Sequence, residues 1–238
     1  MTTTLNIRQD GGHILLPIDD RIALVDTGSP VSFAGEPFSF GGESYSPPTN
    51  MMGVTTQTLS ELAGFNIDIL IGCDILSEHT IRFRWNDKCI DIGDDIPDGA
   101  IASRMETLQG SPVFPLDIGA IGVNAIFDTG AHLSYIRPAL VEGIAQTGEK
   151  ADFHPFNGHF TAPTYQVKTQ IGIHDFDMEY GILPGLLQQA VNMAFQMSGS
   201  SAVIGTQLLE HFDCTISWKR KMISWSKSEI LPKNRTAG

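Results

Sequence analysis

The sequence predicts an all-β protein made of two related lobes, and three observations support this. Short apolar runs rich in Ile, Val, Phe and Trp alternate with Gly, Pro, Asn and Asp, which is typical of many short strands joined by turns. The tripeptide Asp-Thr-Gly occurs twice, at 26–28 and at 128–130, each time after an apolar run. The segments around the two tripeptides align with each other, so the chain contains two copies of one unit.

A second pair of matched segments extends this repeat over most of the chain. Residues 71–92 lie over residues 204–225 without a gap, at a constant offset of 133 (205 − 72), and Trp85 meets Trp218. The Asp-Thr-Gly segments align at an offset of 102 (128 − 26). Because the offset grows by 31 residues (133 − 102), the second copy carries an insertion, which we place between residues 150 and 184.

The strongest break in composition is at residues 94–99, between the two copies. It divides the chain into an N-terminal lobe of residues 1–97 and a C-terminal lobe of residues 98–238, which holds the larger insertion. Only residues 56–63 and 184–197 are predicted to be helical, the second beginning at a proline suited to a helix start. We expect each helix to cover the core of its lobe.

Residues 152–161 have the pattern of a β-hairpin in the C-terminal lobe. Aromatic arms flank Asn157-Gly158, a favoured sequence for a two-residue turn. Two interpretations of Phe153, Phe156 and Phe160 stay open, because these rings could contact a substrate or pack the hairpin onto its lobe. The N-terminal lobe offers a shorter candidate hairpin at residues 38–45.

The composition is that of a globular protein. The chain has 238 residues, of which 42% are apolar and 18% charged, enough for one large or two small domains. A net charge of −12 argues against nucleic acid or an anionic membrane as a partner, since both would repel it. Because no signal peptide and no membrane-spanning apolar run are visible, we expect a soluble protein, cytoplasmic or periplasmic if expressed as written. We expect a monomer, because one chain carries both copies of the repeat.

The cysteines and histidines do not indicate a metal or cofactor site. Three cysteines cannot all pair, and Cys73, Cys89 and Cys214 have no metal-binding spacing, so we interpret them as small buried side chains. A disulfide between Cys73 and Cys89 is the alternative. The seven histidines form no HExxH motif or Cys/His cluster, and we expect neither a metal nor an organic cofactor.

The two aspartates are the candidate catalytic residues. A strand that delivers an aspartate into a glycine-containing turn holds a carboxylate in place, and two such turns in matched positions predict that Asp26 and Asp128 face each other. Two carboxyl groups about 3 Å apart cannot both ionise, so one pKa rises and the other falls. Such a pair supplies both a base that activates water and an acid that protonates the reacting amide.

Six neighbouring residues are expected to support the two aspartates: Thr27, Gly28, Ser29, Thr129, Gly130 and Ala131. The glycines permit the backbone angles of the turns and keep side chains away from a substrate. The threonine hydroxyls could tie one turn to the other. Ser29 could donate a hydrogen bond to Asp26, whereas Ala131 cannot do so for Asp128, so we expect Asp26 to be the more acidic of the two.

The two Asp-Thr-Gly turns, together with the apolar-apolar-glycine strands at 70–72 and 203–205, resemble the aspartic proteases of the pepsin and retropepsin superfamily. The resemblance implies a bilobal pepsin-like fold with roughly six to seven strands in each lobe and few short helices. It also implies an active site between the lobes, a β-hairpin flap that closes over bound peptide, and inhibition by pepstatin. The chain is similar to two retropepsin subunits fused together.

The lengths of the two copies suggest which lobe carries the flap. From Asp26 to Gly72 there are 46 residues (72 − 26), against 77 in the second copy (205 − 128). We therefore expect the main flap in the C-terminal lobe around Asn157-Gly158, with Tyr45 as an N-terminal counterpart of the flap tyrosine of pepsins. The candidate substrate contacts are Tyr45, Phe156, Asn157, Gly158 and Phe160.

Three classes of function follow from the resemblance. The first is an endopeptidase that cleaves extended polypeptides bound in β-conformation. The second is a catalytically silent peptide-binding module, and the third is a structural domain whose turns only connect strands. Both aspartates and both glycines are intact, which favours the enzyme. The expected partner is a peptide or protein substrate.

Overall fold

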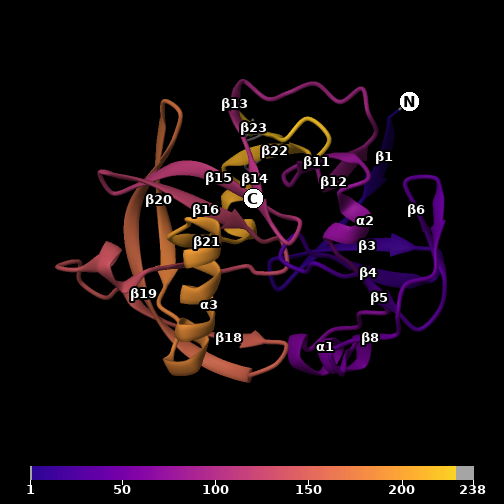
Figure 1. The fold of residues 1–238 in the computed structure, drawn as a ribbon, viewed down its shortest axis with the longest axis horizontal. Helices are drawn as coiled ribbons and strands as arrows, with labels where there is room; N and C mark the ends of the chain where they lie inside the picture. The colour runs from indigo at the N-terminus through magenta and orange to yellow at the C-terminus, as the bar shows by residue number, and fades with distance from the viewer. Residues whose placement is uncertain (1, 229–238) are drawn as a thin grey trace, which may run out of the picture.

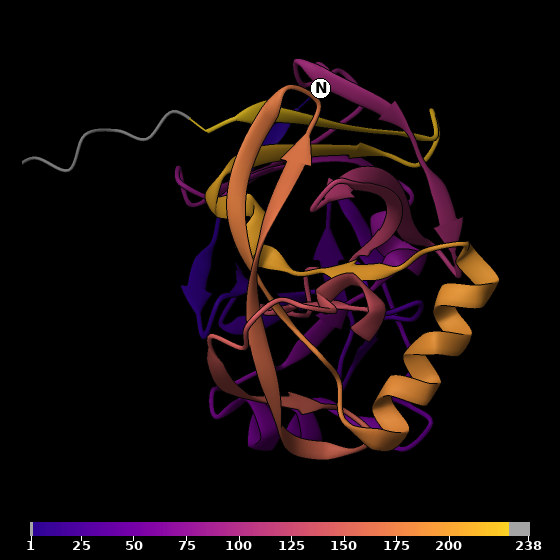
Figure 2. The same cartoon turned by 90° about the vertical axis from the view of Figure 1, so that its left-hand side faces the viewer.

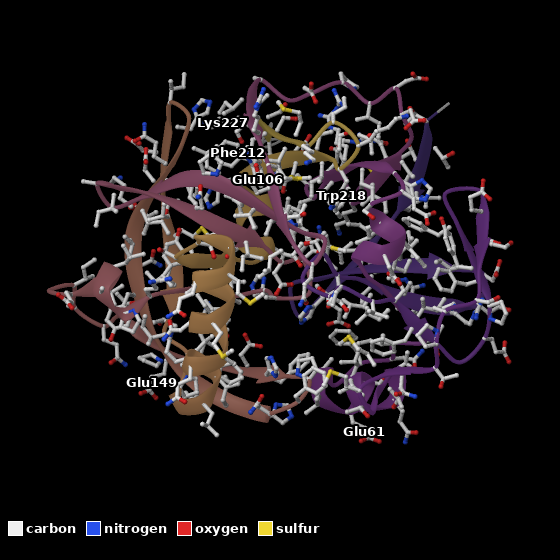
Figure 3. All side chains as sticks on the ribbon, in the orientation of Figure 1. Glu61, Glu106, Glu149, Phe212, Trp218 and Lys227 are labelled. Atoms are coloured by element: carbon white, nitrogen blue, oxygen red, sulfur yellow. The ribbon has the colours of Figure 1, made fainter. Side chains whose placement is uncertain are left out.

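A computed structural model of the chain describes residues 2–228 and shows an all-β protein with two lobes and few helices (Figure 1). The sheets differ in size from the six to seven strands expected in each lobe. One lobe has a five-stranded sheet, the other has an eight-stranded sheet, and a third sheet of six strands takes members from both lobes. Charged side chains such as Glu61 and Glu149 lie exposed at the outer edge of the molecule (Figure 3).

The five-stranded sheet organises the N-terminal lobe. Across the sheet its strands are β2 (Arg8–Asp10), β3 (His13–Ile18), β4 (Arg21–Val25), β10 (Ile69–Ile71) and β5 (Phe33–Ala34). Strands β4 and β10 run parallel, with Val25 opposite Ile71. Residues 23–25 and 69–71 of these strands are apolar and buried, which suits strands that are covered on both faces. The strand before the first Asp-Thr-Gly therefore lies beside the apolar-apolar-glycine strand.

Two small hairpins and two helices complete this lobe. The hairpins are β6 (Phe38–Phe40) with β7 (Glu43–Tyr45), and β8 (Asn50–Met51) with β9 (Val54–Thr55); the helices are α1 (Thr56–Ala63) and α2 (Cys73–Leu76). The hairpin expected at residues 38–45 is confirmed, with a two-residue turn at Gly41-Gly42. Helix α1 has the predicted bounds, since a capping box at Thr55 begins it and Gly64, at φ 79°, ends it.

The eight-stranded sheet repeats this plan in the C-terminal lobe. Its strands are, in order, β14 (Glu106–Leu108), β15 (Ser111–Ile118), β16 (Ile121–Phe127), β21 (Ala202–Ile204), β17 (Ser134–Ile136), β20 (His174–Gly181), β19 (Gly158–Ile171) and β18 (Gly148–His154). Strands β16 and β21 are parallel, with Phe127 opposite Ile204, as β4 and β10 are in the first lobe. The long β19–β20 hairpin is strongly twisted (Figure 2).

Helix α3 (Gly185–Ser198) runs along one side of the C-terminal lobe (Figure 2) and lies within one residue of the predicted helix. Its Phe195 packs in a cluster with Val113 and Ile126, so the helix covers part of the core as expected. The short helices α2, η1 (Pro138–Val141) and η2 (Thr206–Glu210) were not predicted, because one turn is too short to show helical periodicity.

The six-stranded sheet joins the two lobes. Its order is β1 (Thr3–Asn6), β12 (Cys89–Ile92), β11 (Thr80–Arg84), β22 (Phe212–Ser217), β23 (Met222–Lys227) and β13 (Ile101–Arg104). The strands β11 and β22, which correspond in the repeat, pair at its centre with Ile81 opposite Ile216. Trp85 belongs to the main core and Trp218 packs against it. Because this core contains residues of both lobes, the lobes are held in one arrangement.

The structure excludes the alternative disulfide and does not test the boundary between the lobes. Cys73 and Cys89 are both free and buried, so the alternative disulfide does not form. The division between residues 97 and 98 falls in the segment 93–100, which has no strand or helix and joins β12 to β13; we retain it as a proposal. Within residues 2–228, no helix is long and apolar enough to cross a membrane.

The turn of the β18–β19 hairpin differs from the prediction. Residues His154 and Gly158 are paired, so the loop has three residues rather than the two of an Asn157-Gly158 turn. The N–H of Asn157 donates to the carbonyl of His154 at 3.0 Å, and Gly158 follows at φ 73°. Pro155, second in this turn, favours a type I turn followed by a left-handed glycine, and this preference overrides that of Asn-Gly for a type I′ turn.

Candidate active site

Both aspartates lie where a buried strand ends beside a parallel partner. Asp26 follows β4, and its N–H donates to the carbonyl of Ile71 at 2.9 Å. Asp128 follows β16, and its N–H donates to the carbonyl of Ile204, also at 2.9 Å. The two lobes thus present the two carboxyl groups in the same way, as the repeat in the sequence predicts.

Four buried hydrogen bonds tie the two turns together. The Thr27 hydroxyl donates to the carbonyl of Phe127 at 2.8 Å and accepts from the N–H of Thr129 at 2.9 Å. The Thr129 hydroxyl donates to the carbonyl of Val25 at 2.7 Å and accepts from the N–H of Thr27 at 3.0 Å. Both threonines are completely buried, so these bonds are shielded from water. The expected role of the two hydroxyls is confirmed.

The two carboxyl groups approach each other closely. Each lies against the glycine of the opposite turn, and the charge of Asp26 acts on the pKa of Asp128. A Cβ placed on Gly28 would lie 2.3 Å from Cγ of Asp128, and one on Gly130 would lie 2.4 Å from Cγ of Asp26. The glycines are therefore required by space rather than by backbone angle, because neither has a positive φ.

The surroundings of the pair favour one proton shared between two carboxyl groups. Burial raises the pKa of Asp26, and the N–H groups of Gly28 and Ser29, which bond its Oδ1 at 2.8 and 3.0 Å, oppose this rise. Burial, then the charge of Asp26, raises the pKa of Asp128 further above its usual value. Asp26 accepts these two N–H groups, whereas Asp128 accepts one, from Gly130 at 2.9 Å, so the hydrogen bonds favour the charge on Asp26 and the proton on Asp128.

The origin of this asymmetry differs from the expectation. The Ser29 hydroxyl does not donate to Asp26; it donates to the carbonyl of Val31 at 2.9 Å. The side chain turns back onto its own loop, and the backbone N–H of Ser29 serves Asp26 instead. Ala131 contributes an N–H near Asp128 and a small side chain in the cavity.

The two aspartates open into a cavity of about 300 Å³ between the lobes. We define the flap hairpin as residues 148–164, the paired part of β18 and β19. Its residues 152–156 line this cavity with both aspartates, so the flap belongs to the C-terminal lobe. The N-terminal lobe contributes Met51 and Val54, from its short β8–β9 hairpin. The remaining lining is largely apolar.

The predicted substrate contacts divide into two groups. Phe156 and Phe160 line the cavity, although Phe160 also packs against a cluster of the C-terminal lobe, so both interpretations apply to it. Asn157 and Gly158 lie in the flap turn, outside the lining residues. The prediction for Tyr45 is wrong: its hydroxyl donates to Glu78 at 2.7 Å in a separate cavity, because the β6–β7 hairpin packs away from the aspartates.

Tyr135 and Asp152 also line the cavity and were not identified from the sequence; Phe153, one of the aromatic residues of the predicted hairpin, lines it too. The repeat contains a signal for Tyr135, because an aromatic residue, Phe33, occupies the equivalent position at an offset of 102. Both rings line the cavity. No comparable signal marks Asp152, which belongs to the insertion. In the part of the chain that the structure describes, no group of His, Cys, Asp and Glu is arranged to hold a metal ion.

Comparison with known proteins gives fold similarity alone. No protein-family model and no curated protein sequence matches the chain. Basic 7S globulin from soybean is similar at 11% identity and a TM-score of 0.54, covering 97% of each chain. Conglutin gamma, a basic 7S globulin from lupine seeds, is similar at 9% identity and a TM-score of 0.50, covering 96% of this chain and 95% of its own.

A third structure is a retropepsin-like aspartic protease from Rickettsia conorii. It matches at 15% identity and a TM-score of 0.35, covering 52% of this chain and 86% of its own. The architecture described above and the two whole-chain matches place this chain in the all-β, bilobal, pepsin-like fold class.

Proposed function

We propose that the chain is an aspartic endopeptidase that hydrolyses extended polypeptides with Asp26 and Asp128. The observation that carries this proposal is the placement of two buried carboxyl groups against each other, each over the opposite glycine, at the floor of a cavity between the lobes. Keeping two such groups together is unfavourable unless they share a proton. A fold that needed its turns only to connect strands would have no use for this arrangement.

In the proposed reaction the two aspartates exchange protons with a water molecule and the substrate. Ionised Asp26 takes a proton from the water as its oxygen attacks the carbonyl carbon of the peptide bond. Asp128 gives its proton to the carbonyl oxygen, which produces a neutral tetrahedral diol. When the C–N bond breaks, Asp128 takes back a proton from a diol hydroxyl and Asp26 gives its proton to the leaving nitrogen, which restores the starting pair.

The cavity supports an extended, uncharged segment of substrate near the scissile bond. Apart from the aspartates of the pair, its charged or titratable lining residues are Tyr135 and, from the flap, Asp152 and His154, and no Lys or Arg side chain lines it. Burial lowers the pKa of His154, which favours its neutral form. A segment that lies between the flap and the floor can bond the flap backbone as an added strand does.

The direct test is cleavage of an unfolded protein from pH 3 to 7, with and without pepstatin, comparing wild type with Asp26→Asn. We expect a bell-shaped pH dependence, because one carboxyl group must be ionised and the other protonated. We also expect inhibition by pepstatin and loss of activity in the variant. Cleavage by the folded variant at the wild-type rate would refute the proposal.

A catalytically silent peptide-binding module is the second candidate. It is favoured by the two structures matched over nearly the whole chain, which are named as globulins and not as proteases. This alternative predicts that pepstatin or a peptide binds in titration calorimetry while no substrate is cleaved at any pH. Pepstatin-sensitive cleavage that depends on Asp26 would exclude it.

A further inference from the structure

The flap hairpin is attached to the body of its own lobe through Tyr135. This residue lies in β17, five positions beyond Gly130, and its hydroxyl donates a hydrogen bond to Oδ2 of Asp152 on β18. Its ring also lies 6.2 Å, centroid to centroid, from the ring of Phe160 on β19. Asp152 and Phe160 are directly opposite each other in the hairpin. One tyrosine therefore contacts both strands of the flap at the same level.

Both partners of the Tyr135–Asp152 hydrogen bond are held in place. Oδ1 of Asp152 accepts from the N–H of Phe153 at 2.7 Å, which fixes the plane of the carboxylate. The Tyr135 ring is buried and packs closely on Gly181, where an added Cβ would lie 2.8 Å from the ring. Burial, and then the charge of Asp152, raises the pKa of Tyr135, so its hydroxyl keeps the proton that it donates.

The next flap residue contacts the other lobe. The ring of Phe153 lies 6.1 Å from the ring of His13, a buried residue of β3 in the N-terminal lobe. Consecutive residues of β18 thus meet one lobe through a hydrogen bond and the other through a ring contact. The flap is therefore held on both sides of the cavity. Among the described residues, its contact with the N-terminal lobe at Phe153 is a ring contact, whereas on its own lobe the Tyr135–Asp152 hydrogen bond is joined by the ion pair of Lys150 with Glu179.

We propose that Tyr135 and Asp152 are positioning residues for the proposed peptidase. Their hydrogen bond holds the flap close enough to the two aspartates to bind the backbone of a substrate that lies between the flap and the aspartates. The role of these two residues in catalysis rests on the proposed function, whereas the hydrogen bond between them does not depend on it. A hydrogen bond with a charged acceptor is worth about a tenfold or larger change in an equilibrium. Without it, the open states of the flap should become about tenfold more populated.

Amide hydrogen exchange of the flap hairpin tests the proposal without any substrate. Tyr135→Phe keeps the ring and removes the hydroxyl, and we expect exchange in residues 148–164 to become about tenfold faster. Tyr45→Phe is the matched control, since Tyr45 also donates to a carboxylate, that of Glu78, but lies outside the cavity. It should leave flap exchange unchanged. Wild-type flap exchange in folded Tyr135→Phe would overturn the proposal.

Variants of Asp152 cover the case in which Tyr135→Phe does not fold. Asp152→Ala should accelerate flap exchange to the same extent, and adding Tyr135→Phe to it should bring no further increase. Asp152→Asn keeps an acceptor oxygen and should restore most of the protection. Equal exchange in the Ala and Asn variants would contradict a hydrogen-bonding role.

Kinetics then separate this proposal from the proposed function. If wild type cleaves peptides, Tyr135→Phe should raise KM about tenfold more than Tyr45→Phe does, with a smaller change in kcat, because the flap binds rather than reacts. An unchanged KM in an active enzyme would remove the positioning role. Tenfold faster flap exchange in a protein with no peptidase activity would refute the proposed function and leave the flap attachment established.

Discussion

Replacing Thr27 by valine tests the hydrogen bonds that hold the two Asp-Thr-Gly turns together. Valine keeps the shape of threonine but removes the hydroxyl, which donates to the carbonyl of Phe127 and accepts from the N–H of Thr129. Because the site is completely buried, no solvent can replace the lost partner. Two backbone groups are left unpaired in the interior.

Each unpaired buried group costs about 1 to 3 kcal/mol, so Thr27→Val should lower the free energy of unfolding by about 2 to 6 kcal/mol. The matched control is Thr27→Ser, which keeps both hydrogen bonds and loses one methyl group, a cost of about 1 kcal/mol. A protein of this kind has a total stability of about 5 to 15 kcal/mol. The valine variant should therefore lose a large share of it.

Urea unfolding followed by tryptophan fluorescence and circular dichroism measures both variants under the same conditions. The midpoint of Thr27→Val should fall well below that of Thr27→Ser, with similar denaturant slopes. If the two variants differ by less than about 0.5 kcal/mol, the hydroxyl bonds do not hold the turns together and the reasoning is wrong.

Two further predictions concern the carboxyl pair. Gly130→Ala places a Cβ 2.4 Å from Cγ of Asp26 and should lower the free energy of unfolding by about 1 to 3 kcal/mol. Gly35→Ala is the control: no atom lies near its added Cβ, so it should lower the free energy of unfolding by less than about 0.5 kcal/mol. Equal losses in the two variants would contradict the close approach of Asp26 to Gly130. For Asp128, burial raises the folded pKa, so its stabilising contribution is complete below the unfolded pKa of about 3.9 and is lost as pH rises through the folded value. Asp128→Asn should thus be more stable than wild type at pH 7 but not at pH 3, and parallel stability curves in urea unfolding across pH would contradict the shift.

The carboxyl pair could be predicted because its determinants are local and occur twice. Each aspartate follows an apolar run that forms a buried strand, and each turn ends in a glycine that the opposite carboxyl group requires. The repeat then places the two turns in equivalent positions. The threonine hydroxyls could be assigned for the same reason, since a side chain next to each aspartate can reach only the neighbouring turn.

The flap could be assigned to the correct lobe but not built from sequence. Its loop differs because Pro155 fixes one backbone angle and outweighs the Asn-Gly preference that follows it. Tyr45 was misplaced because the sequence does not tell which of two short N-terminal hairpins faces the cavity. The bond between Tyr135 and Asp152 joins β17 to β18, and it depends on how the strands stack, which a local pattern does not encode.

In the proposed mechanism, one chain supplies both carboxyl groups of the catalytic pair. This can be tested by measuring kcat/KM on an unfolded protein substrate for Asp26→Asn and Asp128→Asn, each alone and the two mixed, with folding verified for both. We predict a loss of about 10² to 10⁴-fold or more in each variant, and no recovery on mixing. Wild-type activity in either folded variant would contradict the pair, and recovery on mixing would show that the site forms between two chains.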